Sequence, residues 1–172
     1  MLLIMLQLRD LPTNEVLGKF AERYPDADIS AVSGFLHLLR VATDLSIALD
    51  ACLSKHQLLQ GRWWVLILLM REASKTSMPS VLAEKAGVSR ATMTGLIDGL
   101  EQSGLVERIY TKDDRRSIQI KLTDAGQAKL DEVMPDYYRR VRKCMRALDA
   151  DKREQLQQLL ELIHLGTPAL TE

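Results

Sequence analysis

The segment from Met78 to Leu122 constrains the fold most, because its pattern fits one order of elements. Residues 79–86 have a short helical pattern with Pro79 at the first position, and Gly87 follows where a left-handed C-cap would end the helix. Ser89 then suits the N-cap of a second helix. The apolar residues of this second helix recur at helical spacing and form one stripe: Met93, Leu96, Ile97 and Leu100. The segment therefore begins with two helices joined by a tight turn.

Two short runs after Gly104 predict a β-hairpin. Residues 105–110 and 117–122 have the composition of strands, and apolar and polar residues alternate in the second run. The connection between them is Thr111-Lys112-Asp113-Asp114-Arg115-Arg116, which is too polar for a core and predicts an exposed basic tip. Helix, turn, helix and hairpin together predict a winged helix-turn-helix with a two-stranded wing.

The second helix has an exposed face that suits DNA. With its apolar stripe turned to the core, its N-terminal half presents small and polar side chains. In a major groove, Thr and Ala can contact a thymine methyl, and Arg can reach guanine or a phosphate. Asp98 would repel phosphates, so we expect only residues 89–94 of this helix to meet DNA. The predicted DNA-binding residues are Ser89, Arg90, Ala91, Thr92, Thr94, Lys112, Arg115 and Arg116.

Helical patterns flank this unit on both sides, so the chain is predicted to be mainly α. We expect helices over residues 13–24, 28–55, 58–71 and 123–148, and a last one from Asp149 or Asp151 to about residue 165. The helix after Asp28 is apolar on more than one face, and one small domain cannot cover it. A homodimer is the simplest solution. The predicted division is an N-terminal extension with a short helix (1–28), helical dimerisation regions (29–57 and 123–172) and a DNA-binding domain (58–122).

Composition bounds the function classes. The chain is 47% hydrophobic and 27% charged, and its formal net charge is zero, so we expect only moderate non-specific DNA affinity and binding by two copies together. The apolar start, residues 1–6, is too short for a signal or membrane span, so we expect a cytoplasmic protein without membrane contact. The sequence has no Gly-rich phosphate loop, nucleophile motif or metal-ligand spacing, so we expect no enzyme activity, no cofactor and no metal.

Three runs in this chain resemble the MarR family of bacterial transcriptional regulators: residues 82–94, 113–117 and 121–126. The resemblance covers about residues 30–165 and assigns no role to the N-terminal extension. It implies an obligate homodimer with a triangular helical body and recognition of double-stranded DNA by the helix beginning at Ser89. It also implies a wing in which Asp114 orients Arg116 toward the minor groove. Many members of the family are repressors that respond to small aromatic acids or phenols, and others sense oxidants through a cysteine.

Four residues are candidates for an effector cleft: His37, Arg40, Trp63 and Trp64. His37 and Arg40 lie on adjacent turns, and Arg40 would pair with a carboxylate ligand. The stronger interpretation is structural, with the two tryptophans packed in the core and Arg40 paired with Asp44 at i+4. The basic run Arg139, Arg140, Arg142, Lys143 and Arg146 is either a phosphate contact or, more commonly, a solvated helix face.

Two functions from different classes remain open after this reasoning. The first is a DNA-binding repressor that responds to a ligand and binds a pseudo-palindromic operator as a homodimer. The alternative is a winged-helix protein-interaction module without DNA affinity. A variant of the first is a thiol-based redox sensor, but of Cys52 and Cys144 only Cys144 has basic neighbours, which a reactive thiol needs, so we expect both to be packed thiols.

Overall fold

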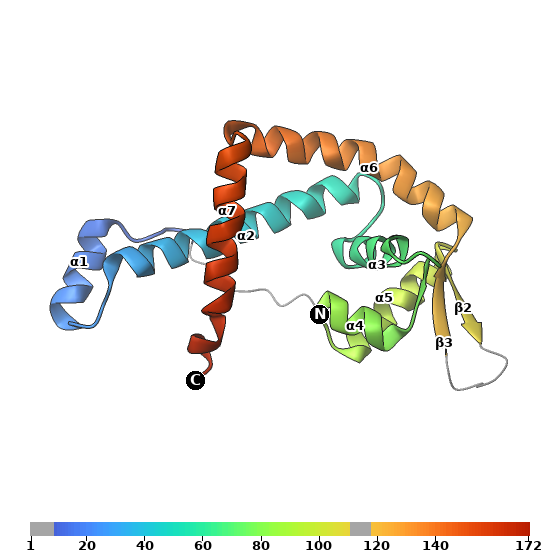
Figure 1. Cartoon of the computed structure of the whole chain (residues 1–172), viewed down its shortest axis with the longest axis horizontal. Helices are drawn as coiled ribbons and strands as arrows, with labels where there is room; N and C mark the ends of the chain where they lie inside the picture. Colours follow the sequence, from blue (N-terminus) through green and yellow to red (C-terminus); the bar gives the residue numbers. More distant parts are fainter. Residues whose placement is uncertain (1–8, 111–117) are drawn as a thin grey trace.

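Helices α3 to α6 and a small sheet enclose the buried core of the chain, while α1, α2 and α7 extend from it as arms (Figure 1). The computed structural model describes residues 9–110 and 118–172. Over these residues the α-helices are α1 (Asn14–Arg23), α2 (Ile29–Ser54), α3 (Gln60–Arg71), α4 (Pro79–Ala86), α5 (Arg90–Gln102), α6 (Asp124–Cys144) and α7 (Ala150–Leu165). Two 3₁₀ helices, η1 (Met145–Ala147) and η2 (Thr167–Leu170), follow α6 and α7, so the helix predicted over 123–148 ends in a tighter turn. The mainly α fold with a winged helix-turn-helix is confirmed.

The tight turn between α4 and α5 forms as predicted. Gly87 ends α4 in the left-handed region at φ 64°, where a side chain would be strained. The Ser89 hydroxyl then accepts a hydrogen bond from the Thr92 backbone N–H and caps α5. Met93, Ile97 and Leu100 are buried, so the predicted stripe faces the core.

The sheet has three strands rather than the two predicted. Strands β2 (Val106–Tyr110) and β3 (Ile118–Leu122) form the expected antiparallel hairpin, with Val106 opposite Leu122. The additional strand β1 (Thr76–Ser77) pairs with the other edge of β3. Two residues are too few to show the alternation that predicts a strand, so β1 has no recognisable pattern in the sequence.

Thr123 closes the base of the wing. Its hydroxyl donates to the Gly104 carbonyl at 2.7 Å and accepts from the Gly126 backbone N–H at 3.0 Å. The same residue is the N-cap of α6, so one side chain joins the start of the hairpin, its end and the following helix. A Cβ at Gly126 would lie 2.1 Å from the Leu105 carbonyl oxygen, so only glycine permits this approach.

The core lies between α3 and the elements that pack around it, which are α4, α5, the sheet and α6. Its largest fully buried side chains come from the end of α2, from α3, α4, α5, β3 and α6, and from Leu58 in the α2–α3 connection. Trp63 is fully buried and its ring packs against Tyr137 of α6, with ring centroids 5.5 Å apart. Among the described residues, every buried side chain of the core is hydrophobic.

The arms carry apolar side chains that the chain itself leaves exposed. On α2 these include Val32, Phe35 and Leu39, and on α7 they include Leu159 and Ile163. By length and composition α2 would also suit a membrane span. An ion pair between Arg40 and Asp44, 2.7 Å apart, lies in the middle of α2, and charged groups at such a position are costly in a bilayer.

Candidate nucleic-acid interface

The N-terminal half of α5 forms an exposed polar surface. Ser89, Arg90, Ala91, Thr92 and Thr94 are all exposed, whereas Met93 between them is buried in the core. Local hydrogen bonds fix the hydroxyl groups, since Ser89 Oγ lies 2.9 Å from Thr92 Oγ1, and Thr94 donates to the Arg90 carbonyl at 2.9 Å. Fixed hydroxyls lower the entropy cost of a contact with a base or phosphate. The structure therefore brings these five predicted residues together on one surface.

Arg108 of β2 pairs with both carboxylates in the C-terminal half of α5. Its guanidinium pairs with Asp98, 2.6 Å away, and with Glu101. The hydrogen bond that Arg108 donates to Asp98, followed by the two carboxylate charges, raises the pKa of Arg108 further above its ordinary value. Asp98 was expected to repel phosphates as a free charge, but it is held in this ion pair. Sequence reasoning missed Arg108 because the pair joins a helix to a strand seven and ten residues later.

The predicted tip of the wing lies outside the described residues. It contains Lys112, Asp114, Arg115 and Arg116. The strands that present it are described, and Tyr110 at the end of β2 is 61% exposed. On the same hairpin, Lys121 Nζ lies 3.1 Å from Glu107 Oε1, so this lysine is paired within the wing.

Comparisons with known proteins agree on one family. A model described as "MarR family" matches residues 63–118. The homoprotocatechuate degradative operon repressor of Escherichia coli is 31% identical over 113 residues, which are 65% of this chain and 75% of that protein. The chain belongs to the MarR family. The HTH-type transcriptional repressor YetL of Bacillus subtilis is also similar, with 27% identity over 90% of this chain and 93% of YetL.

The solved MarR structures share the fold. Sco3205, a MarR family regulator from Streptomyces coelicolor solved in complex with DNA, superposes with a TM-score of 0.72. The match covers 81% of this chain and 88% of Sco3205, at 22% identity. The MarR family consists of transcription regulators rather than enzymes, which confirms the prediction that this chain is not an enzyme.

The candidate effector residues of this MarR chain occupy different settings. His37 Nδ1 lies 2.8 Å from the Ser33 carbonyl of its own helix, and Arg40 pairs with Asp44 as the structural interpretation expects. Trp63 is fully buried, whereas Trp64 is 40% exposed. The described contacts of His37 and Arg40 stay within α2, so these contacts do not join the four residues into one cleft.

A cluster of charged side chains around Asp136 joins the α2–α3 connection to α6. The two ring nitrogens of His56 each lie 3.2 Å from a carboxylate oxygen, Nδ1 from Glu132 and Nε2 from Asp136. Asp136 also accepts from Arg139 and Arg140. The hydrogen bond from Arg140, followed by that from His56, holds the pKa of Asp136 well below its ordinary value. The cluster fixes α6 to the end of α2, and sequence reasoning missed it because His56 and Asp136 are 80 residues apart.

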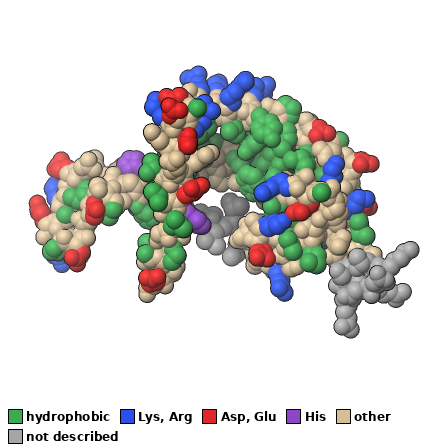
Figure 2. Space-filling model, in the orientation of Figure 1, with side chains coloured by type: hydrophobic (Ala, Val, Ile, Leu, Met, Phe, Trp, Pro, Cys, Tyr) green, Lys and Arg blue, Asp and Glu red, His purple; other side chains and the backbone are tan. Residues whose placement is uncertain are grey.

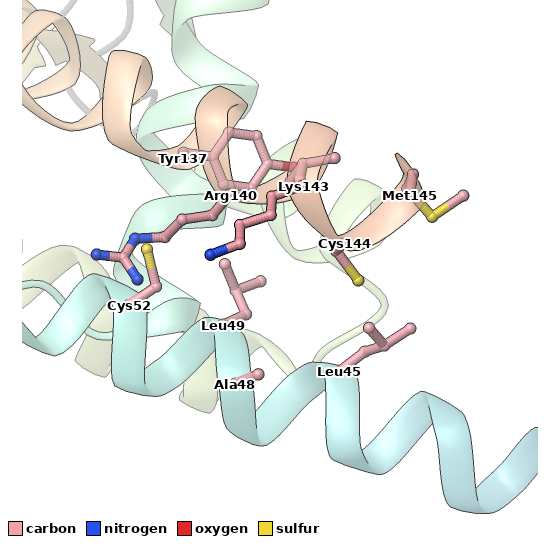
Figure 3. Close-up of a pocket in the computed structure, with 10 residues that line it drawn as sticks. Leu45, Ala48, Leu49, Cys52, Tyr137, Arg140, Lys143, Cys144 and Met145 are labelled. Atoms are coloured by element: carbon pink, nitrogen blue, oxygen red, sulfur yellow. The ribbon is translucent and has the colours of Figure 1, made fainter. Parts of the chain in front are cut away.

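The two cysteines line one groove between α2 and α6 (Figure 3). Cys52 is buried on α2, with its thiol 3.9 Å from Asp136, and Cys144 is exposed at the end of α6. Arg140 and Lys143 extend from α6 toward α2 in the same groove (Figure 3). The prediction of two packed thiols is therefore wrong for Cys144, which is exposed.

Proposed function

We propose that the protein is a homodimeric transcriptional repressor that binds double-stranded DNA through α5 and the wing. The observation that carries this proposal is the division of α5 into two halves. Its N-terminal half is exposed, polar and free of carboxylates, whereas both carboxylates of its C-terminal half are paired with Arg108. The likeness to Sco3205, solved with DNA, and the repressor relatives support the same function.

The homodimer part of the proposal rests on the exposed apolar arms. Contiguous apolar surface of this kind is rare on monomeric proteins, and a second copy of the same arms would cover it. The predicted division into dimerisation regions (29–57 and 123–172) and a DNA-binding domain (58–122) is part of this proposal. A twofold dimer with two recognition helices would bind a pseudo-palindrome with half-sites about one helical turn apart.

Direct contacts are proposed at two surfaces with different tasks. Ser89, Arg90, Ala91, Thr92 and Thr94 would read base edges and position the helix in the major groove. At the wing tip, Arg116, oriented by Asp114, would enter the minor groove, with further phosphate contacts from Lys112 and Arg115.

The test measures the affinity of the protein at several salt concentrations for two duplexes, a palindromic operator from the promoter region and a scrambled sequence. We expect operator binding that weakens steeply as salt rises, because each neutralised phosphate releases counterions. A protein-interaction module would bind neither duplex at low salt. A complete lack of DNA binding by a folded dimer would therefore contradict the proposal.

We propose in addition that a small aromatic or phenolic acid relieves DNA binding. The partly exposed ring of Trp64 supports binding of such an acid, because it offers an aromatic surface against which the ligand ring can pack. Titration with salicylate, followed by the fluorescence of the two tryptophans, tests it. A saturable change that Trp64→Phe abolishes is expected, and an unchanged operator affinity at saturating salicylate would contradict relief by such acids.

A further inference from the structure

The groove between α2 and α6 has an apolar floor and a basic edge. It has a volume of about 550 Å³, and Leu45, Leu49 and Val141 are among its apolar lining residues. Lys143 supplies a positive charge to it, and Arg140 lies in it as one of the two arginines that pair with Asp136. Figure 2 shows further Lys and Arg side chains gathered over α6, above a hollow with many hydrophobic side chains. The groove therefore suits an apolar segment with negative charges at its borders.

The helix α1 has the matching surface. Leu17 is 7% exposed and faces the neighbouring helix α2, whereas Val16, Phe20 and Tyr24 are 40%, 53% and 56% exposed. Val16 and Phe20 are four residues apart on one face of α1, and Tyr24 follows at its C-cap, so the three form one apolar stripe along α1 and its end. Residues 9–28 hold five carboxylates and three basic side chains, which gives this segment a net negative charge: Asp10, Glu15, Glu22, Asp26 and Asp28 against Arg9, Lys19 and Arg23.

The α1 helix of the same chain cannot reach the groove. It is attached at Ile29, and Leu49 in the groove lies 20 residues further along the continuous helix α2, or about 30 Å at 1.5 Å per residue. Figure 1 shows α1 at the free end of α2, away from the end that approaches α6. Only another molecule can supply the occupant if α1 keeps its position.

A second copy brings its own α1 to the right place. The exposed large apolar residues of α2 run from Val32 to Ile47, and their midpoint is near residue 39. If two α2 helices pair antiparallel across a twofold axis at this midpoint, Ile29 of one copy lies opposite Leu49 of the other. The turn between α1 and α2 then lies beside the groove.

We propose that α1 of each protomer docks into the α2–α6 groove of a second copy of the chain. The stripe of Val16, Phe20 and Tyr24 covers the apolar floor, and the acidic segment faces Arg140 and Lys143. The inference rests on the homodimer of the proposed function and gives the N-terminal extension a role in it. Two symmetric dockings extend the interface of the α2 and α7 arms.

Cross-linking through Cys144 tests the docking. In full-length protein carrying Cys52→Ala, Cys144 is the one remaining native cysteine and is exposed. Tyr24→Cys places a second thiol on the apolar stripe, and Asn14→Cys places one on another face of α1 without removing a charge, as a matched control. A short bismaleimide should then produce a covalent dimer at least about tenfold faster with Tyr24→Cys than with Asn14→Cys, because docked thiols have a high effective concentration. Adding Cys144→Ala should abolish the product, and Lys143→Glu should slow its formation.

The outcomes separate this docking from the homodimer itself. Equal rates for the two variants, or a cross-link within one chain, would overturn the docking. Rapid cross-linking with Leu162→Cys and not with Tyr24→Cys would also overturn it, because α7 would then fill the groove. Sedimentation of the same samples reports the dimer separately. A dimer that lacks the cross-link contradicts only the docking, whereas a monomer contradicts the homodimer of the proposed function as well.

Discussion

Replacing Arg108 by Met tests how the charge on α5 is controlled. The substitution keeps much of the apolar stem but removes the cation that pairs with Asp98 and Glu101. The net charge of the three groups changes from −1 to −2 in each protomer, so a dimer presents two additional negative charges near the DNA. Because all three side chains are partly exposed, at 22%, 48% and 36%, the loss of folding stability should be only about 1 kcal/mol.

The effect on DNA affinity should exceed the effect on stability. Two unit charges about 10 Å apart in water interact by about 0.4 kcal/mol. With two or three phosphates near each recognition helix and two protomers, the added repulsion is about 2 kcal/mol, or roughly thirtyfold in affinity at low salt. The penalty should shrink toward 0.15 M salt, where the Debye length is about 8 Å.

Fluorescence anisotropy with a labelled operator, measured at several salt concentrations, provides the assay. Lys152→Met is the matched control, since it removes a cation paired with Asp149 on α7, away from α5. Adding Asp98→Asn and Glu101→Gln to Arg108→Met should raise the affinity to at least that of the parent protein, because the three positions then carry no charge. The reasoning is refuted if Arg108→Met binds as tightly as the parent protein, or if the triple variant stays weak while folded.

Three further predictions concern the exposed surface of α5, the base of the wing and the cluster around His56 and Asp136. Arg90→Ala and Thr94→Val should each lose about 1 to 3 kcal/mol of binding free energy on the operator and little on scrambled DNA. Arg116→Ala should weaken binding to both duplexes and lower the slope of its salt dependence by about one. Equal losses on both duplexes for Arg90→Ala and Thr94→Val would contradict the assignment of these residues to base contacts. Gly126→Ala should lower the free energy of unfolding in urea by about 2 to 4 kcal/mol, because the new Cβ would collide with a backbone carbonyl, and an unchanged midpoint would contradict this close approach. Because the folded-state pKa of Asp136 is lowered, its contribution to stability should be complete above the ordinary carboxyl pKa near 4 and lost as pH falls below it. Chemical unfolding between pH 6 and pH 3 should thus show a shallower pH dependence for Asp136→Asn, and parallel curves would contradict this role.

Local patterns in the sequence were sufficient to predict most of the elements. Capping residues, apolar spacing and Gly87 act within a few residues, so α4, the turn and α5 could be predicted closely. The exposed surface from Ser89 to Thr94 followed from the buried stripe on the same helix. The remaining features depend on contacts between distant residues. The pairing of Arg108 with Asp98, and of His56 with Asp136, becomes visible only once the helices and the sheet are placed in space.

The two hydrogen bonds that the Thr123 hydroxyl makes at the base of the hairpin affect how such a protein can be altered. Because this one hydroxyl bonds the residues on both sides of the hairpin, the start of α6 does not depend on the connection between Tyr110 and Ile118. In general, doubling the length of a loop costs only about 0.6 kcal/mol in closure entropy. The tip can therefore be lengthened or exchanged to alter which operators are recognised, while the helical body retains its stability.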